Sequence, residues 1–294
     1  MILLFSALLF QAVISVHTEL VAVPVTVTDA RGRHVGGLSQ ANFRLFEDGR
    51  PRPITAFLHG DVPVTLGLIV DRSQSMRPKR AALAAAVSAL LQSSRPDDEL
   101  FGVDFNDRVT FALAGDRPFT HDTTELATAL IAVPAESQTA LYDGVAEGLQ
   151  HLALGHGERR ALIVVSDGGD NTSRRTYKEI LALARRSDAV IYAIGLLGTS
   201  PADEEEDAGL LRRLCRDTGG IAYFPETLDD IAAMSTAIAR DLREQYTLGF
   251  VPADGNGRRT YRTIEVKVTA PVRGRLHVRT RSGYLPAGNQ EDRR

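Results

Sequence analysis

Five polar residues stand out in the sequence because their types and order could hold a metal ion. All five offer hard oxygen atoms, and they fall in three separate segments of the chain: Asp71, Ser73 and Ser75, then Thr139, then Asp167. Oxygen ligands in octahedral geometry suit Mg²⁺ or Mn²⁺, whereas Ca²⁺ prefers more oxygens and more direct carboxylates. The pattern therefore predicts a site for a small divalent cation, with Mg²⁺ as the first choice.

The charge balance of such a site gives a second expectation. If the hydroxyl groups bind the ion directly and the aspartates act through water, the ion keeps much of its positive field. An open coordination position then attracts a carboxylate from another molecule. The site would dock the Asp or Glu side chain of a protein partner.

Apolar residues place these polar segments at the ends of regular elements. Residues 64–70 form a continuous apolar run directly before the first segment, and residues 160–165 form another shortly before the third. Such runs are typical of strands that are buried on both faces of a parallel sheet. The second segment precedes a helix expected over residues 140–154.

Strands and helices alternate from residue 63 to residue 243, which predicts an α/β domain with a doubly wound, mostly parallel sheet flanked by helices. Ligands bind at the carboxyl ends of the strands in such sheets, and the first and fourth strands flank the point where the strand order reverses. All three polar segments should therefore meet at one edge. Further strands are expected over 99–105, 108–113, 189–194 and 221–224, and helices over 78–91, 124–131, 177–186, 204–217 and 228–242.

The two flanks of this domain have β patterns. Residues 18–60 alternate in polarity and contain a hairpin turn at Asp48-Gly49, and residues 244–286 predict three more strands, the last over residues 276–285. Neither flank alone can bury much core. We expect them to pair in one small β-sandwich into which the α/β domain is inserted. The polar tail, residues 287–294, is expected to be disordered.

The first 16 residues resemble the apolar core of a secretory signal, although no Lys or Arg precedes it. A buried N-terminal strand, or a start codon placed too far downstream, remains an alternative. The run is too short for an ordinary bilayer span, so no stable membrane span is predicted. We expect the protein to be exported to the periplasm or cell surface.

Composition and missing motifs exclude several classes of function. A net charge of −3 without a basic tract argues against nucleic-acid binding. The single cysteine excludes internal disulfides and cysteine-based zinc sites. The sequence has no Gly-x-Ser-x-Gly elbow, no P-loop and no His-Glu-x-x-His motif, so it predicts a protein that is not an enzyme.

The ordered set Asp71-x-Ser73-x-Ser75, Thr139 and Asp167 resembles the metal-ion-dependent adhesion site of the von Willebrand factor type A (VWA) domain, without a substitution. The resemblance covers residues 63–243 and implies a Rossmann-like VWA fold. It also implies that the two serines and the threonine contact the metal directly. The flanks resemble a narrower group, the acidobacterial-type VWFA-related exported proteins.

These observations predict a metal-dependent protein-binding module that captures a partner carboxylate through Mg²⁺. Two alternatives stay open: a structural subunit whose metal only stiffens the loops, and a hydrolase in which Asp167 or Asp170 activates water beside a Lewis-acidic ion. For the five site residues the alternative role is N-capping of helices.

Neighbouring residues allow more than one role. Asp143 fits the first turn of a helix, with support of the metal ligands as an alternative. Asp170 and Asn171 could extend the site or form the turn. Arg72 is expected to be solvated, with the steering of anions as an alternative.

Three other features favour structural interpretations. The acidic run 203–207 is expected to open a helix rather than to bind calcium. Cys215 is expected to be a buried thiol, because it shares a helix face with Leu211. The seven histidines are scattered and form no pair with the spacing of metal ligands.

Overall fold

The structure is a computed structural model, and it describes residues 20–286 except 114, 116, 198–200, 254–259 and 271–273. The side chains of residues 201–206 are also outside the description. The expected signal segment and the expected disordered tail both lie outside the described residues. None of the helices in the described part is long and apolar enough to cross a bilayer.

A central sheet of six strands runs through the described part of the α/β domain, in the order β10-β9-β8-β5-β6-β7. Its strands are β5 (Val64–Asp71), β6 (Glu99–Phe105), β7 (Val109–Phe111), β8 (Arg159–Ser166), β9 (Val190–Gly195) and β10 (Ala222–Tyr223). All neighbours are parallel except β6 and β7, which form an antiparallel pair at one edge. The predicted fold class is confirmed.

Strand β5 lies in the middle of the sheet because it can be buried on both faces. All eight of its residues are buried, as the continuous apolar run predicts. It pairs in register with β8 on one side and with β6 on the other. The strand order therefore reverses between β5 and β8, which places the polar segments after these two strands side by side.

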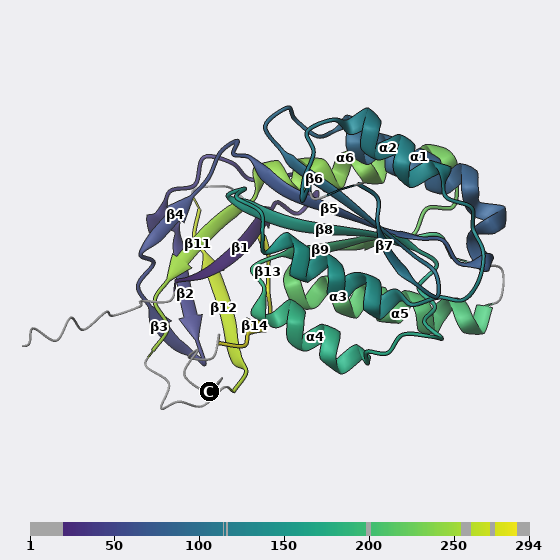
Figure 1. Cartoon of the computed structure of the whole chain (residues 1–294). Helices are drawn as coiled ribbons and strands as arrows, with labels where there is room; N and C mark the ends of the chain where they lie inside the picture. Colours follow the sequence, from purple (N-terminus) through teal and green to yellow (C-terminus); the bar gives the residue numbers. More distant parts are fainter. Residues whose placement is uncertain are drawn as a thin grey trace, which may run out of the picture.

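Helices cover both faces of the sheet (Figure 1). Apolar residues of the helices α1, α2 and α6 pack in one core, and those of α3, α4 and α5 pack in another on the opposite face. The bounds are α1 (Arg80–Gln92), α2 (Thr123–Ala132), α3 (Leu141–Leu152), α4 (Tyr177–Arg186), α5 (Pro201–Thr218) and α6 (Leu228–Glu244).

The start of the first helix differs from the expectation. The sequence predicts a helix from Pro78, but a 3₁₀-helix, η2 (Gln74–Lys79), contains Pro78, and α1 begins at Arg80. The tighter winding is visible in the bond from Met76 N to Ser73 O, at 3.0 Å. This turn carries the chain from the end of β5 into α1.

The flanks form two small sheets of four strands each within the described residues, in the orders β13-β1-β11-β4 and β14-β12-β2-β3. Each sheet combines strands from both ends of the chain, and the two sheets share one apolar core. The bounds are β1 (Val21–Thr28), β2 (Phe43–Glu47), β3 (Arg50–Arg52), β4 (Ala56–Leu58), β11 (Tyr246–Phe250), β12 (Arg262–Val268), β13 (His277–Thr280) and β14 (Gly283–Tyr284). We call these two sheets the sandwich.

The prediction of a single strand at the end of the second flank is wrong. Residues 276–285 are expected to form one strand, but they form β13 and β14, which belong to different sheets. The chain turns at Arg281, whose buried side chain donates to Gly283 O at 3.0 Å and to Arg185 O at 2.7 Å. A buried arginine that satisfies backbone carbonyls is a tertiary feature, which strand periodicity does not reveal.

Candidate metal centre

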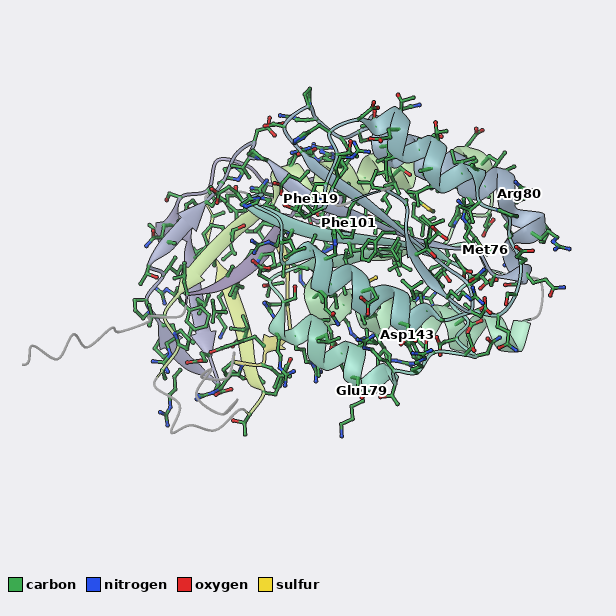
Figure 2. All side chains as sticks on the ribbon, in the orientation of Figure 1. Met76, Arg80, Phe101, Phe119, Asp143 and Glu179 are labelled. Carbon is green, nitrogen blue, oxygen red and sulfur yellow. The ribbon has the colours of Figure 1, made fainter. Side chains whose placement is uncertain are left out.

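Three loops at the carboxyl ends of the sheet carry the five predicted site residues. The first loop (residues 71–79) follows β5, the second (133–140) connects α2 to α3, and the third (166–176) follows β8. Figure 2 shows Met76, in the first loop, and Arg80, directly after it, at the end of the α/β domain that lies away from the sandwich. The loops are therefore not covered by the sandwich.

Backbone hydrogen bonds join the first loop to the second. Gln74 N donates to Ser137 O at 3.0 Å, and Glu136 N donates to Arg72 O at 2.8 Å. Ser137 has a φ of 72°, a conformation that non-glycine residues adopt infrequently. These bonds compensate for its cost by fixing the turn that leads to Thr139.

Asn171 joins the second loop to the third. Its Oδ1 accepts from Thr139 N at 2.9 Å, and its own backbone N donates to Thr139 O at 3.0 Å. Thr139 itself is buried. Of the two roles left open for Asn171, the structure shows the structural one: it holds Thr139 in place.

Asp71 joins the third loop back to the first. Its Oδ1 accepts from Ser73 N at 2.8 Å, and its Oδ2 accepts from Ser166 Oγ at 2.6 Å. Ser166 directly precedes Asp167, so the bond brings the two aspartates together. The three loops thus form a closed set of contacts, in which each loop is bonded to both others.

The hydroxyl groups of Ser73 and Ser75 lie 3.0 Å apart. Ser73 is buried, whereas Ser75 is exposed. The pair of hydroxyl groups therefore extends from the protein interior to the solvent-exposed surface. Oxygen atoms at this separation are spaced as two ligands of one metal ion can be.

Helix capping does not occupy the predicted site residues next to the three helix starts. Ser73 stands at the N-cap position of η2, but its hydroxyl makes no capping bond. The N-cap of α3 is Ala140 rather than Thr139, and α4 is capped by Thr176 in a capping box with Glu179. The capping alternative is therefore not supported at the starts of η2, α3 and α4.

Residues of the third loop cap α3 from outside the helix. Asp170 Oδ1 accepts from Tyr142 N at 3.1 Å, and Ser173 Oγ accepts from Asp143 N at 3.2 Å. Asp143 lies in the first turn of α3, as predicted, and accepts from Arg174 N at 2.9 Å. Asp170 and Asp143 therefore fix the third loop against α3.

Burial and like charge destabilise the ionised form of Asp71. Loss of solvation and the nearby charge of Asp167 raise the pKa of Asp71 to about 6, although hydrogen bonds from Ser166 and Ser73 lower it. Asp167 pairs with Lys79, whose Nζ lies 3.0 Å from Asp167 Oδ2. The ammonium group of Lys79 thus pairs with Asp167, whereas Asp71 is bonded to neutral donors.

Arg72 lies in the protein interior, so both interpretations of its side chain from the sequence are wrong. It is only 2% exposed, and burial lowers its pKa. It continues the alternation of β5 and therefore points to the same face as Val70, where α1 packs. The charge of Arg80 also lowers the pKa of Arg72, whereas the charges of Asp104 and Asp71 raise it.

Helix α5 packs closely against the third loop. Gly168 has a φ of 97°, and a Cβ at this position would lie 2.9 Å from Asp207 Cβ and 3.0 Å from Asp207 O. The acidic run 203–207 lies at the start of α5, as predicted, and the side chains of 203–206 are outside the description. Cys215, on the same helix, is buried, as predicted.

The donor set fits a hard divalent cation. It combines two carboxylates with three hydroxyl groups, and its charge is balanced only in part by Lys79. Among the described residues, no cluster of three or more His, Cys, Asp or Glu side chains could hold a metal. The hydroxyl groups are therefore essential to the predicted site.

Comparison with known proteins identifies the family. The sequence of residues 66–237 matches the von Willebrand factor type A domain. This chain belongs to that family. No curated protein sequence matches it significantly.

Solved structures show the same VWA fold at low sequence identity. A VWA protein from Catenulispora acidiphila matches with a TM-score of 0.52 and 11% identity, over 83% of this chain and 73% of that one. Proximal thread matrix protein 1 from the mussel byssus matches with a TM-score of 0.52 and 16% identity, over 67% and 51%. The pilus adhesin SpaC from Lactobacillus rhamnosus GG matches with a TM-score of 0.50 and 10% identity, over 83% and 48%.

Sequence reasoning missed two residues of the site. Ser166 stands beside Asp167 and donates to Asp71, and Lys79 pairs with Asp167. A weak signal existed for Lys79, because the chain contains only three lysines among 34 basic residues. No pattern in the sequence marks Ser166.

Proposed function

We propose that this protein is a metal-dependent protein-binding module. Ser73, Ser75 and Thr139 hold a Mg²⁺ ion, with Mn²⁺ as a substitute, and Asp71 and Asp167 act on it through water. The ion captures an Asp or Glu carboxylate of a protein partner. The observation that carries the proposal is the closed set of hydrogen bonds that joins the three loops around buried Asp71.

Charge and exposure favour capture of an outside anion. Burial and the charge of Asp167 raise the pKa of Asp71. A divalent ion would offset the repulsion between these two carboxylates. Ser75 is exposed and directly precedes Met76, which lies at the end away from the sandwich (Figure 2), so an ion beside Ser75 is open to solvent. A carboxylate is the hard oxygen ligand that a partner protein can supply there.

Two alternatives receive less support. In a hydrolase, Asp170 or Asp167 would have to activate water. Asp170 Oδ1 instead accepts two hydrogen bonds, from Tyr142 N and Ser173 Oγ, and Asp167 is paired with Lys79. A purely stabilising metal would not need the exposed hydroxyl of Ser75. Turnover of a phosphate or ester panel that depends on Mg²⁺ would restore the enzyme hypothesis.

The fold of two solved relatives suits this role. One is a pilus adhesin and the other a thread matrix protein of the mussel byssus. We propose on this basis, and on the apolar start of the chain, that the protein is exported and acts in adhesion or as a scaffold. The partner is a protein rather than a nucleic acid, given the net charge of −3.

The test is a capture experiment on surface proteins of the native host. Immobilised wild type should retain a partner in Mg²⁺ and release it in EDTA. Ser73→Ala should lose most of the capture, because a direct metal ligand is gone. Ser88→Ala, a serine on α1 away from the site, is the matched control and should behave as wild type.

Two outcomes would contradict the proposal in different ways. Capture that is equal in Mg²⁺ and EDTA would show that no metal bridge exists. If Mg²⁺ raised the melting temperature of wild type only, while Ser73→Ala captured the partner equally well, the metal would be a stabilising one.

A further inference from the structure

We propose that Lys79 is a built-in competitor for the metal, which neutralises Asp167 when no divalent ion is bound and must leave Asp167 when one binds. The inference rests on the proposed metal site and adds a residue that sets its affinity. Nothing in the five-residue pattern assigns Lys79 a role.

The contact is specific and only partly open to water. Lys79 Nζ lies 3.0 Å from Asp167 Oδ2, and the two side chains are 18% and 12% exposed. Salt screens such a pair less than it screens a surface pair. The ammonium group thus occupies one oxygen of a carboxylate that the proposed function assigns to the metal.

The helices beside Lys79 supply no acidic partner for its ammonium group. Lys79 is both the last residue of η2 and the N-cap of α1, so the dipoles of the two helices act on it in opposite senses. No acidic residue lies in the first turn of η2 or α1, whereas α2, α3, α4 and α6 each have at least one. The acidic partner of Lys79 is Asp167, from the third loop.

The charges of the site explain why the ammonium group is an incomplete substitute. Asp71 accepts only from neutral donors among the described residues, Ser73 N and Ser166 Oγ. Lys79 pairs with only one of the two carboxylates, Asp167. A divalent ion neutralises both, while a monovalent metal ion would bring no more charge than Lys79 already supplies. Exchange therefore favours a divalent ion, but it costs the Lys79–Asp167 pair.

Lysine suits this role better than arginine. Its ammonium is a compact point charge with three donors, which approximates a small spherical cation. The planar guanidinium of arginine prefers to lie flat against one carboxylate. The chain has 34 basic residues, of which three are lysines and 31 are arginines. The candidate site contains one of these three lysines.

The experiment measures the affinity for Mn²⁺ by electron paramagnetic resonance of the free ion. Lys79→Gln and Lys79→Met should bind Mn²⁺ about threefold to thirtyfold more tightly than wild type, because the competing charge is gone. Lys79→Arg should stay within about threefold of wild type. Lys178→Gln removes an exposed lysine on α4 and is the matched control.

A second measurement follows thermal unfolding. In EDTA both neutral variants should melt at a lower temperature than wild type, because Asp167 then loses its cationic partner while the charge of Asp71 stays near it. In saturating Mg²⁺ this deficit should disappear. A residue that merely packed against Asp167 would lower the melting temperature in both conditions.

The outcomes separate this inference from the proposed function. If wild type binds Mn²⁺ and both neutral variants bind it equally or more weakly, the inference is wrong and Lys79 instead positions Asp167. If only the neutral variants bind measurably, Lys79 blocks the wild-type site and the inference holds. If no variant binds, the metal site fails and the inference fails with it.

Discussion

At the scale of single residues, the burial of Asp71 makes the candidate site costly to fold. Asp71 is fully buried, and both of its oxygens are held by neutral donors. Its ionised form is therefore poorly stabilised, as the rise of its pKa from 3.8 to about 6 shows. A divalent ion bound at the proposed site would stabilise the ionised carboxylate of Asp71 and so offset this cost.

Asp71→Asn should stabilise the metal-free protein at neutral pH. The raised pKa corresponds to a penalty of at most about 3 kcal/mol above pH 6, since each unit of pKa is worth about 1.4 kcal/mol. The penalty grows as pH rises from about 4 to about 6, because the unfolded chain releases the proton first. Urea unfolding in EDTA should show the gain at pH 7.5 and little gain at pH 4.5.

The same variant should lose metal binding, because its side chain is neutral. Asp107→Asn changes an exposed turn residue and should leave stability within about 0.5 kcal/mol of wild type at both pH values. An Asp71→Asn protein that is less stable than wild type at pH 7.5 in EDTA would show that Asp71 is not the strained group.

At the scale of elements, the sequence predicts most of the sheet and helices but not the ties between loops. Periodicity alone places α4 and the buried run of β5, because each is amphipathic or apolar throughout. It cannot show that Asp170 and Ser173 cap α3 from another loop, because these contacts join residues about 30 positions apart. The residue types of the five-residue motif can be read from the sequence, but the hydrogen bonds that hold its loops together join distant parts of the chain.

Arg159, at the start of β8, caps the C-terminal end of α6 from another part of the chain. Its guanidinium donates to Leu242 O at 2.9 Å, Arg243 O at 3.0 Å and Gln245 O at 2.5 Å. These carbonyls lie at the end of α6, where a cation also complements the helix dipole. Because Arg159 is buried, its pKa is lowered to about 10.

Arg159→Met should therefore destabilise the protein by about 3 kcal/mol, because buried carbonyls lose their donors. Urea unfolding measures the change. Arg240→Met is the control, because Arg240 is an exposed residue of α6 whose side chain pairs with Glu244. Its expected cost is below about 1 kcal/mol. Equal costs for the two variants would contradict the capping role of Arg159.

At the scale of the whole molecule, Asp241 joins the α/β domain to the sandwich. This buried residue of α6 accepts from Tyr192 Oη of β9 and from Arg279 of β13, each at 2.5 Å. His34 Nε2 lies 3.7 Å from its other oxygen. A single carboxylate thus holds groups from the central sheet and from both flanks of the chain.

Asp241→Ala should cost about 3–5 kcal/mol, because it leaves the Arg279 charge and the Tyr192 hydroxyl without their acceptor. Hydrogen exchange should show the loss first at β13 and β1, and last at β5 in the central sheet. Asp229→Ala, an exposed residue of α6, is the control. Equal loss of protection in all three strands would contradict a local joint.

The pairing of the flanks follows from their short strands, since neither set can bury a core alone. The division of residues 276–285 between two sheets does not, because it depends on buried Arg281 and on its acceptors in α4 and β14. The orientation of the sandwich also lay beyond the sequence. It leaves the edge that carries the three loops open, which the proposed function requires.

The most direct test of the central claim is a crystal structure of wild type soaked in Mn²⁺, with anomalous scattering recorded at the manganese edge. We expect one strong peak that is coordinated by the hydroxyl oxygens of Ser73, Ser75 and Thr139. One coordination position of this ion should be open to solvent or filled by a carboxylate from another molecule. Absence of a peak among the three loops at millimolar Mn²⁺, or a peak only elsewhere, would contradict it.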